Sequence, residues 1–196
     1  MTIDEKQKRM WDAHHEAGHV VRAVAWQYPV GLSTIEYWNG VDDARHGFTD
    51  HMTFHPSEWT AFDYCKAICI STAGTVAEEK FRRGRRSSLT EEETRDLAWS
   101  ARGDNQDIHE FRVRISHEVP DEAVTRWRIE HVDEWVDNPE IWSSIQVVAR
   151  ALYRRGTLNG IAIGALLQRH HFRSRPGFPA GEESKKQPIN TGDSAY

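Results

Sequence analysis

The segment His15-Glu16-Ala17-Gly18-His19 has the residue types and spacing of the HExxH motif. Residues four apart lie on one face of an α-helix, so His15 and His19 can bind the same metal ion. Glu16 then places a carboxylate beside the open coordination position. Zinc lowers the pKa of a bound water towards about 7. Glu16 can take a proton from that water as it attacks a carbonyl, and return the proton to the leaving amine. The spacing predicts zinc-dependent hydrolysis.

The motif by itself is suggestive rather than decisive. With 11 His and 30 acidic residues among 196, chance alone gives an HExxH in roughly one such chain in twenty. The structural alternative is a pair of solvated histidines on a polar helix face. Residues 3–27 favour the catalytic interpretation, because Met10, Val21 and Val24 recur near helical spacing and no proline occurs before Pro29.

Catalytic zinc usually has three protein ligands and one open position. The metzincin pattern would need a histidine at position 25, where this chain has Ala25. The third ligand must therefore come from a distant part of the chain. Reasoning from residue types alone leaves four acidic candidates, which are Glu78, Glu79, Asp104 and Asp107.

The composition is that of a polar protein with one domain-sized core. Hydrophobic residues make up 38% of 196, the net charge is −5 and the mean hydropathy is −0.70. The acidic balance argues against nucleic-acid binding. No apolar run approaches the roughly 20 residues of a membrane helix, and residues 1–6 lack an apolar signal region. We expect a soluble, cytoplasmic protein that binds no membrane. Cys65 and Cys69 are expected to be buried and reduced.

The elements around the motif predict a mainly α (α+β) fold. Residues 33–38 and 47–54 have strand composition and predict a small antiparallel sheet. The free edge of the second strand could hold an extended peptide. A very apolar helix from about residue 56 to 81 is expected to be the central buried helix.

The remaining elements are mostly helical. Residues 80–88 are expected to form a solvated basic loop, or else a docking patch for an acidic partner. Thr90-x-x-Glu93 has the pattern of a capping box and predicts the start of a helix. We expect a peptidase domain over residues 1–170 and a disordered C-terminal tail over 171–196. The expected helices are 90–101, 108–117 after an interruption at 103–107, one from Pro120, 140–155 ending at Gly156, and 160–169.

Four segments in order resemble the FtsH family of ATP-dependent zinc proteases. HEAGH at 15–19 is similar to that family's motif, and TAGTVAEE at 72–79 resembles its segment of the AGRAAEE type. GDNQDI at 103–108 resembles its GASNDI-type segment, and TLNG at 157–160 is similar to its TLDG-like stretch. The similarity covers roughly residues 10–170.

This resemblance implies a mostly helical peptidase domain with a small β element and Zn²⁺ as cofactor. It implies Asp107 as the third ligand beside His15 and His19, because the last aspartate of the GASNDI-type segment has that role, with Asp104 the close competitor. The chain departs from the family pattern in two respects. The family's domain follows membrane helices and an ATPase, which this sequence lacks, and the spacing from Glu79 to Asp107 is wider than expected.

We therefore expect a zinc endopeptidase that is ATP-independent by itself, with Glu16 as general base. Its substrate would be a peptide or flexible protein, with an unfoldase or adaptor partner and an oligomeric state left open. One rival is a non-catalytic, zinc-stabilised interaction module; another is a zinc hydrolase of non-peptide amides. Glu78 and Glu79 either orient a zinc-bound histidine or salt-bridge their helix. His14 is expected at the surface, and His46, His51 and His109 are loop or surface residues or oxyanion donors.

Overall fold

A computed structural model describes residues 5–36, 47–50 and 59–170. It is mainly helical with one three-stranded antiparallel sheet, which confirms the predicted fold class. The predicted tail at 171–196 lies outside the described residues. The elements in chain order are α1 (Glu5–Ala25), β1 (Leu32–Thr34), β2 (Phe48–Asp50), α2 (Ala61–Arg83), α3 (Glu91–Ser100), α4 (Arg102–Ile115), α5 (Asp121–Arg128), the π-helical turn η2 (Ile129–Asp133), α6 (Glu134–Asp137), α7 (Pro139–Arg155), β3 (Thr157–Asn159) and α8 (Gly160–Arg169).

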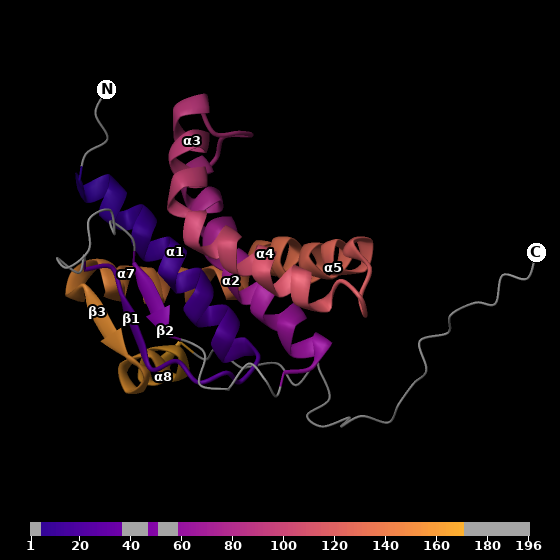
Figure 1. Ribbon diagram of the computed structural model, residues 1–196. Coiled ribbons are helices and arrows are strands. Elements are labelled where there is room, and N and C mark those ends of the chain that lie inside the picture. Colours follow the sequence, from indigo (N-terminus) through magenta and orange to yellow (C-terminus); the bar gives the residue numbers. More distant parts are fainter. Residues whose placement is uncertain (1–4, 37–46, 51–58, 171–196) are drawn as a thin grey trace, which may run out of the picture.

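The core forms where α1 packs against α2 and α7 (Figure 1). α1 and α2 approach each other closely at Gly18 of α1, where an added Cβ would collide with the backbone carbonyl of Ala73 in α2. A glycine in a helix costs about 1 kcal/mol relative to alanine, and here it allows the two helices to touch. The prediction of a central buried helix is confirmed, because α2 buries most of its length.

Helix ends follow local sequence signals. Thr60 and Thr90 each form a capping box, with Asp63 and Glu93 respectively, at the starts of α2 and α3. Gly156 ends α7 with a φ of 77°, a conformation that favours glycine. None of the helices in the described segments is both long and apolar enough to cross a bilayer.

The predicted interruption at residues 103–107 is wrong, because this polar stretch forms the first turns of α4. Ala101 makes the bend between α3 and α4 and is buried. Asp104 lies in the first turn of α4, where the helix dipole favours a carboxylate. The bend therefore turns an acidic helix start towards α2, against which α4 packs.

The sheet has the strand order β2-β1-β3, so β2 lies at an edge among the described strands. Ser33 of β1 pairs with Thr49 of β2 and with Leu158 of β3. The sequence did not predict β3, since three residues carry too little pattern to distinguish a strand from a helix lead-in. Figure 1 shows the sheet on one side of the helices, and β2 contacts α1.

Candidate metal centre and active site

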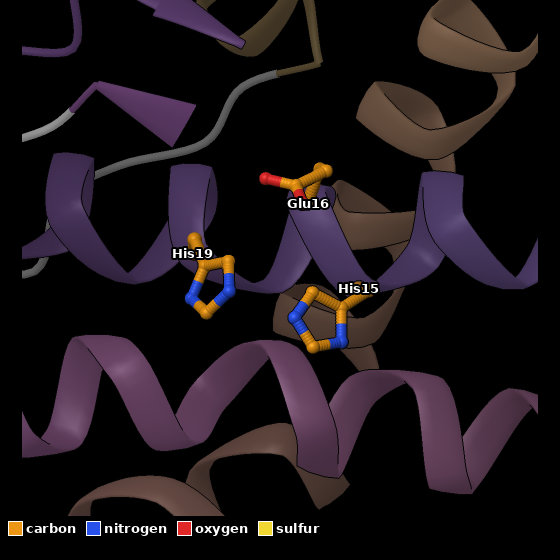
Figure 2. Close-up of side chains that lie close together, drawn as sticks. All are labelled: His15, Glu16 and His19. Carbon is orange, nitrogen blue, oxygen red and sulfur yellow. The ribbon is translucent and has the colours of Figure 1, made fainter. Parts of the chain in front are cut away.

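His15 and His19 lie one turn apart on α1 and are both buried, with 7% and 4% of their surface exposed. Their ring centroids are 4.8 Å apart. Figure 2 shows the two imidazoles side by side on one face of α1, with the Glu16 carboxylate projecting elsewhere from the same helix. The alternative of two solvated histidines is excluded, since burial of two imidazoles requires compensating partners.

Both histidines have a hydrogen-bond acceptor at Nδ1. His15 Nδ1 lies 2.8 Å from Glu78 Oε2, and His19 Nδ1 lies 2.8 Å from the carbonyl oxygen of Ile70. A carboxylate and a carbonyl can only accept, so each Nδ1 carries the proton. In the neutral tautomer, each Nε2 then has a lone pair available for a metal.

Asp104 brings a carboxylate to both of these Nε2 atoms. Its Oδ2 lies 2.9 Å from His15 Nε2 and 3.4 Å from His19 Nε2. Burial disfavours its charged form, but His19 and His15 outweigh that effect and hold the pKa of Asp104 well below its usual range. Although burial alone would lower the pKa of His15 and of His19, the nearby carboxylates raise both.

Asp107, which the resemblance singled out as the third ligand, lies one turn farther along α4. It lines the same pocket but forms no ion pair with either histidine among the described residues. Burial raises the pKa of its carboxyl, and the charges of Asp104 and Glu110 raise it further. The geometry therefore favours Asp104, the close competitor, over Asp107.

Glu16 is almost completely buried and faces the sheet rather than α2. Thr49 Oγ1 of β2 donates a 2.5 Å hydrogen bond to Glu16 Oε2. Ser33 Oγ is in turn hydrogen-bonded to Thr49 Oγ1 at 2.9 Å. Burial raises the pKa of Glu16, while His19, His15 and Thr49 oppose the rise. A raised pKa brings a carboxylate nearer to the operating pH of a general base.

A buried network holds Glu78 behind His15. Its side chain is fully buried and is paired with Arg82, and Ser100 Oγ donates to Oε2 at 2.9 Å. Arg82 also donates to Asp96 of α3 at 2.8 Å. The prediction of a solvated loop over residues 80–88 is wrong for Arg82, which is buried in the last turn of α2. His15 and Arg82 hold the pKa of Glu78 low despite its burial.

Two glycines leave room for the site's side chains. A Cβ on Gly74 of α2 would overlap the His19 ring, and a Cβ on Gly47 would overlap the Glu16 carboxylate. Sequence reasoning identified neither role. The only signal was the small-residue run TAGT, which is equally typical of any closely packed helix pair.

A pocket of about 410 Å³ opens onto these groups. Its walls come from α1, from β2 with Gly47, and from the α3–α4 bend. The size falls in the range of small-ligand clefts. Its lining residues are Asp12, His15, Glu16, His19, Gly47, Phe48, Thr49, Asp50, Ser100, Gly103, Asp104 and Asp107.

The donor set is of a kind that could hold a divalent metal ion. Ligand atoms of His15, Glu16 and His19 lie within 4.8 Å of one another. Asp104 Oδ2 is buried and has no hydrogen-bond donor among the described residues, although both Nε2 atoms are close. With both ring protons on Nδ1, neither Nε2 can donate a hydrogen bond to this oxygen. Two imidazole nitrogens and one carboxylate oxygen form a ligand set known in catalytic zinc sites.

The other candidate residues lie apart from this cluster. His14, expected at the surface, is instead buried and stacked on Phe81 with ring centroids 3.7 Å apart, because it faces α2 and α7. His109 is exposed on α4, and His46 and His51 lie outside the described residues. Cys65 and Cys69 are buried and free of disulfides, which confirms that prediction.

Comparison with models of protein families and with curated protein sequences gives no match for this chain.

Proposed function

We propose that the protein is a zinc-dependent peptidase in which His15, His19 and Asp104 bind the metal and Glu16 is the general base. The observation that carries this proposal is the approach of Asp104 Oδ2 to both Nε2 atoms, with the Glu16 carboxylate alongside. Asp104 takes the place that the resemblance gave to Asp107. The metal-binding part of the proposal rests on the geometry of described side chains rather than on the motif alone.

The chain's own groups prepare this site for hydrolysis. Glu78 and the Ile70 carbonyl accept hydrogen bonds from the two Nδ1 atoms, which leaves a lone pair on each Nε2 for a metal ion. Thr49 orients the Glu16 carboxylate, and the buried surroundings raise its pKa. When bound, zinc supplies a Lewis acid that activates water and polarises a carbonyl. Glu16 is placed to accept a proton and deliver it to the leaving amine.

The position of strand β2 favours a peptide substrate over a non-peptide amide. Phe48, Thr49 and Asp50 line the pocket, and no described strand pairs with the outer edge of β2. An extended polypeptide can bind such an edge through main-chain hydrogen bonds. Strand addition requires an unfolded segment, so we infer that the substrate is a peptide or a flexible region of a protein.

The test combines metal analysis with proteolysis. Purified protein should contain about one zinc per chain and cleave unstructured casein, and a chelator should abolish cleavage. Glu16→Gln should keep zinc and lose cleavage, because the metal ligands and the base are different residues. Glu79→Gln is the matched control, since Glu79 forms no described hydrogen bond or ion pair with either histidine. Zinc loss in Glu16→Gln would contradict the role given to Glu16.

The rival interpretations give different outcomes. A zinc-stabilised interaction module would bind zinc and show no chelator-sensitive cleavage of casein or peptides. A hydrolase of non-peptide amides would leave casein intact but cleave members of a small-amide panel, with loss in Glu16→Gln. The buried and hydrogen-bonded Glu16 favours an enzyme, because a structural zinc site needs no such base.

A further inference from the structure

Two neighbouring hydroxyls lie on the buried face of the sheet. Ser33 of β1 lies opposite Thr49 of β2 on one side and Leu158 of β3 on the other, and all three side chains are buried. Ile35, two residues farther along the chain, is buried as well. A buried hydroxyl costs free energy unless it is hydrogen-bonded, whereas an apolar side chain packs between strands without that cost. The two hydroxyls therefore indicate a specific hydrogen-bonding role.

These hydroxyls form a chain that ends at the carboxylate of Glu16. Thr49 Oγ1 carries one proton, which it donates to Glu16 Oε2 at 2.5 Å. Ser33 Oγ lies 2.9 Å from Thr49 Oγ1. Because the Thr49 proton is used for the carboxylate, the hydrogen bond between the two hydroxyls must be donated by Ser33. Hydrogen bonds in such a chain polarise one another, so the Ser33 donor strengthens the bond from Thr49 to Glu16.

The main chain just before β2 lies against the same carboxylate. A Cβ added to Gly47 would be 2.5 Å from Glu16 Oε1, while Thr49, two residues later, holds Oε2. The position of β2 depends in turn on its pairing with β1, the central strand of the three that the structure describes. The orientation of Glu16 is thus set from the sheet as well as from its own helix.

We propose that Ser33 is a positioning residue for the general base. It keeps the Thr49 hydroxyl directed at Glu16 and acts on the reaction through Thr49. The inference rests on the proposed peptidase function and adds a residue that does not line the described pocket. Without the Ser33 donor, the Thr49 hydroxyl can turn away, and the carboxylate then samples orientations that are unsuited to proton transfer. Substrate binding along the edge of β2 uses main-chain groups, so loss of the Ser33 hydroxyl should lower kcat and leave KM unchanged.

A second pair of hydroxyls in the same sheet provides a matched control. Thr34 Oγ1 and Thr157 Oγ1 lie 2.8 Å apart between β1 and β3. Neighbouring residues of a strand point to opposite faces, so this pair lies on the other face from Ser33, and both of its side chains are half-buried. Loss of the Thr157 hydroxyl removes a cross-strand hydrogen bond of the same kind without touching the chain that ends at Glu16.

The experiment measures kcat and KM on an internally quenched peptide derived from a casein cleavage site. Ser33→Ala should lower kcat about three- to tenfold, because a hydrogen bond between neutral groups contributes roughly that factor. KM and zinc content should not change. Thr157→Val should leave kcat at the wild-type value. In a Thr49→Val background, Ser33→Ala should have no further effect on kcat, since the chain is already interrupted.

A wild-type kcat in Ser33→Ala, or an equal loss of kcat in the Thr49→Val background, would overturn the inference. If circular dichroism shows that Ser33→Ala does not fold, Ser33→Cys replaces it, because a thiol keeps the size but is a weaker donor. A smaller loss of kcat is then expected, and an unchanged kcat again overturns the inference.

Urea unfolding separates this inference from the proposed function. If the wild type cleaves no peptide, the peptidase proposal fails, but the hydroxyl chain can still be tested. Ser33→Ala should lower the stability of the wild type more than that of Glu16→Met, because the carboxylate strengthens the whole chain of hydrogen bonds. An equal loss of stability in the two backgrounds would show that Ser33 and Glu16 are not coupled.

Discussion

His15 Nδ1 and Glu78 Oε2 lie 2.8 Å apart, although 63 residues separate them in the chain. The pair joins the motif helix α1 to α2, and Ser100 Oγ donates to the same carboxylate oxygen from the end of α3. Ser100 precedes Asp104 by four residues, so the fully buried Glu78 carboxylate contacts both His15, a proposed metal ligand, and the helix end just before Asp104. Glu78 thus connects the segments that carry the proposed metal ligands His15 and Asp104.

Replacing Glu78 with glutamine should raise the zinc dissociation constant about 10- to 100-fold, because the amide orients and polarises His15 less well than a carboxylate. A competition titration with a chromophoric chelator measures this change. Asp96→Asn is the control, since it removes the other carboxylate that Arg82 contacts and leaves His15 untouched. Equal loss of zinc affinity in both variants would assign the effect to the Arg82 network instead.

Asp104→Ala should abolish stoichiometric zinc binding, whereas Asp107→Ala should retain it. The reason is that Asp104 Oδ2 lies close to both Nε2 atoms, whereas Asp107 forms an ion pair with neither histidine among the described residues. Elemental analysis of the purified variants, after dialysis against a weak chelator, gives the zinc content. The reverse pattern would restore Asp107, as the family resemblance implies, and remove Asp104 from the metal site.

Gly74→Ala should fold but bind zinc poorly, because its Cβ would occupy the space of the His19 ring. Gly164→Ala in α8 is the matched control: nothing lies within 4 Å of its added Cβ, and alanine there should stabilise the helix by up to about 1 kcal/mol. Circular dichroism checks folding and elemental analysis checks zinc. Full zinc content in Gly74→Ala would show that α1 and α2 can separate without cost to the site.

Thr49→Val should lower kcat about tenfold with little change in KM or zinc content. The variant keeps the shape of the side chain but loses the hydrogen bond to Glu16, and a bond to a charged group contributes about 1.5 kcal/mol or more. Thr49→Ser should restore kcat, because it returns the hydroxyl. If Thr49→Ser is as impaired as Thr49→Val, the methyl group and its packing matter rather than the hydrogen bond.

Stability should fall above pH 9 because of Cys69. Burial raises the pKa of this thiol from 9.0 to about 12. The unfolded chain therefore loses the thiol proton above pH 9 while the folded chain keeps it, so folding becomes less favourable as pH rises. The free energy of unfolding should be about 1.4 kcal/mol lower at pH 10 because of this thiol. Urea unfolding at pH 7.5 and pH 10 should show this extra loss in the wild type and not in Cys69→Ala.

The sequence by itself determined the features that depend on neighbouring residues. The HExxH spacing placed two imidazoles on one face of α1, and the capping boxes at Thr60 and Thr90 and the glycine at position 156 set helix ends. Helical periodicity also identified α2 as the buried helix. These features follow from hydrogen bonds and steric limits within a few residues, and such interactions can be recognised in a linear pattern.

Only the tertiary structure decided which distant groups complete the site. Asp104 and Asp107 are three residues apart on one helix, so the pattern could not choose between them. The packing of α4 on α2 after the bend at Ala101 brings Asp104 to the histidines of α1. Glu78 behind His15, Thr49 on Glu16 and the pairing of β3 with β1 likewise join segments far apart in the chain. Such contacts depend on how whole helices and strands pack, and that packing is determined by the entire core rather than by any local stretch of sequence.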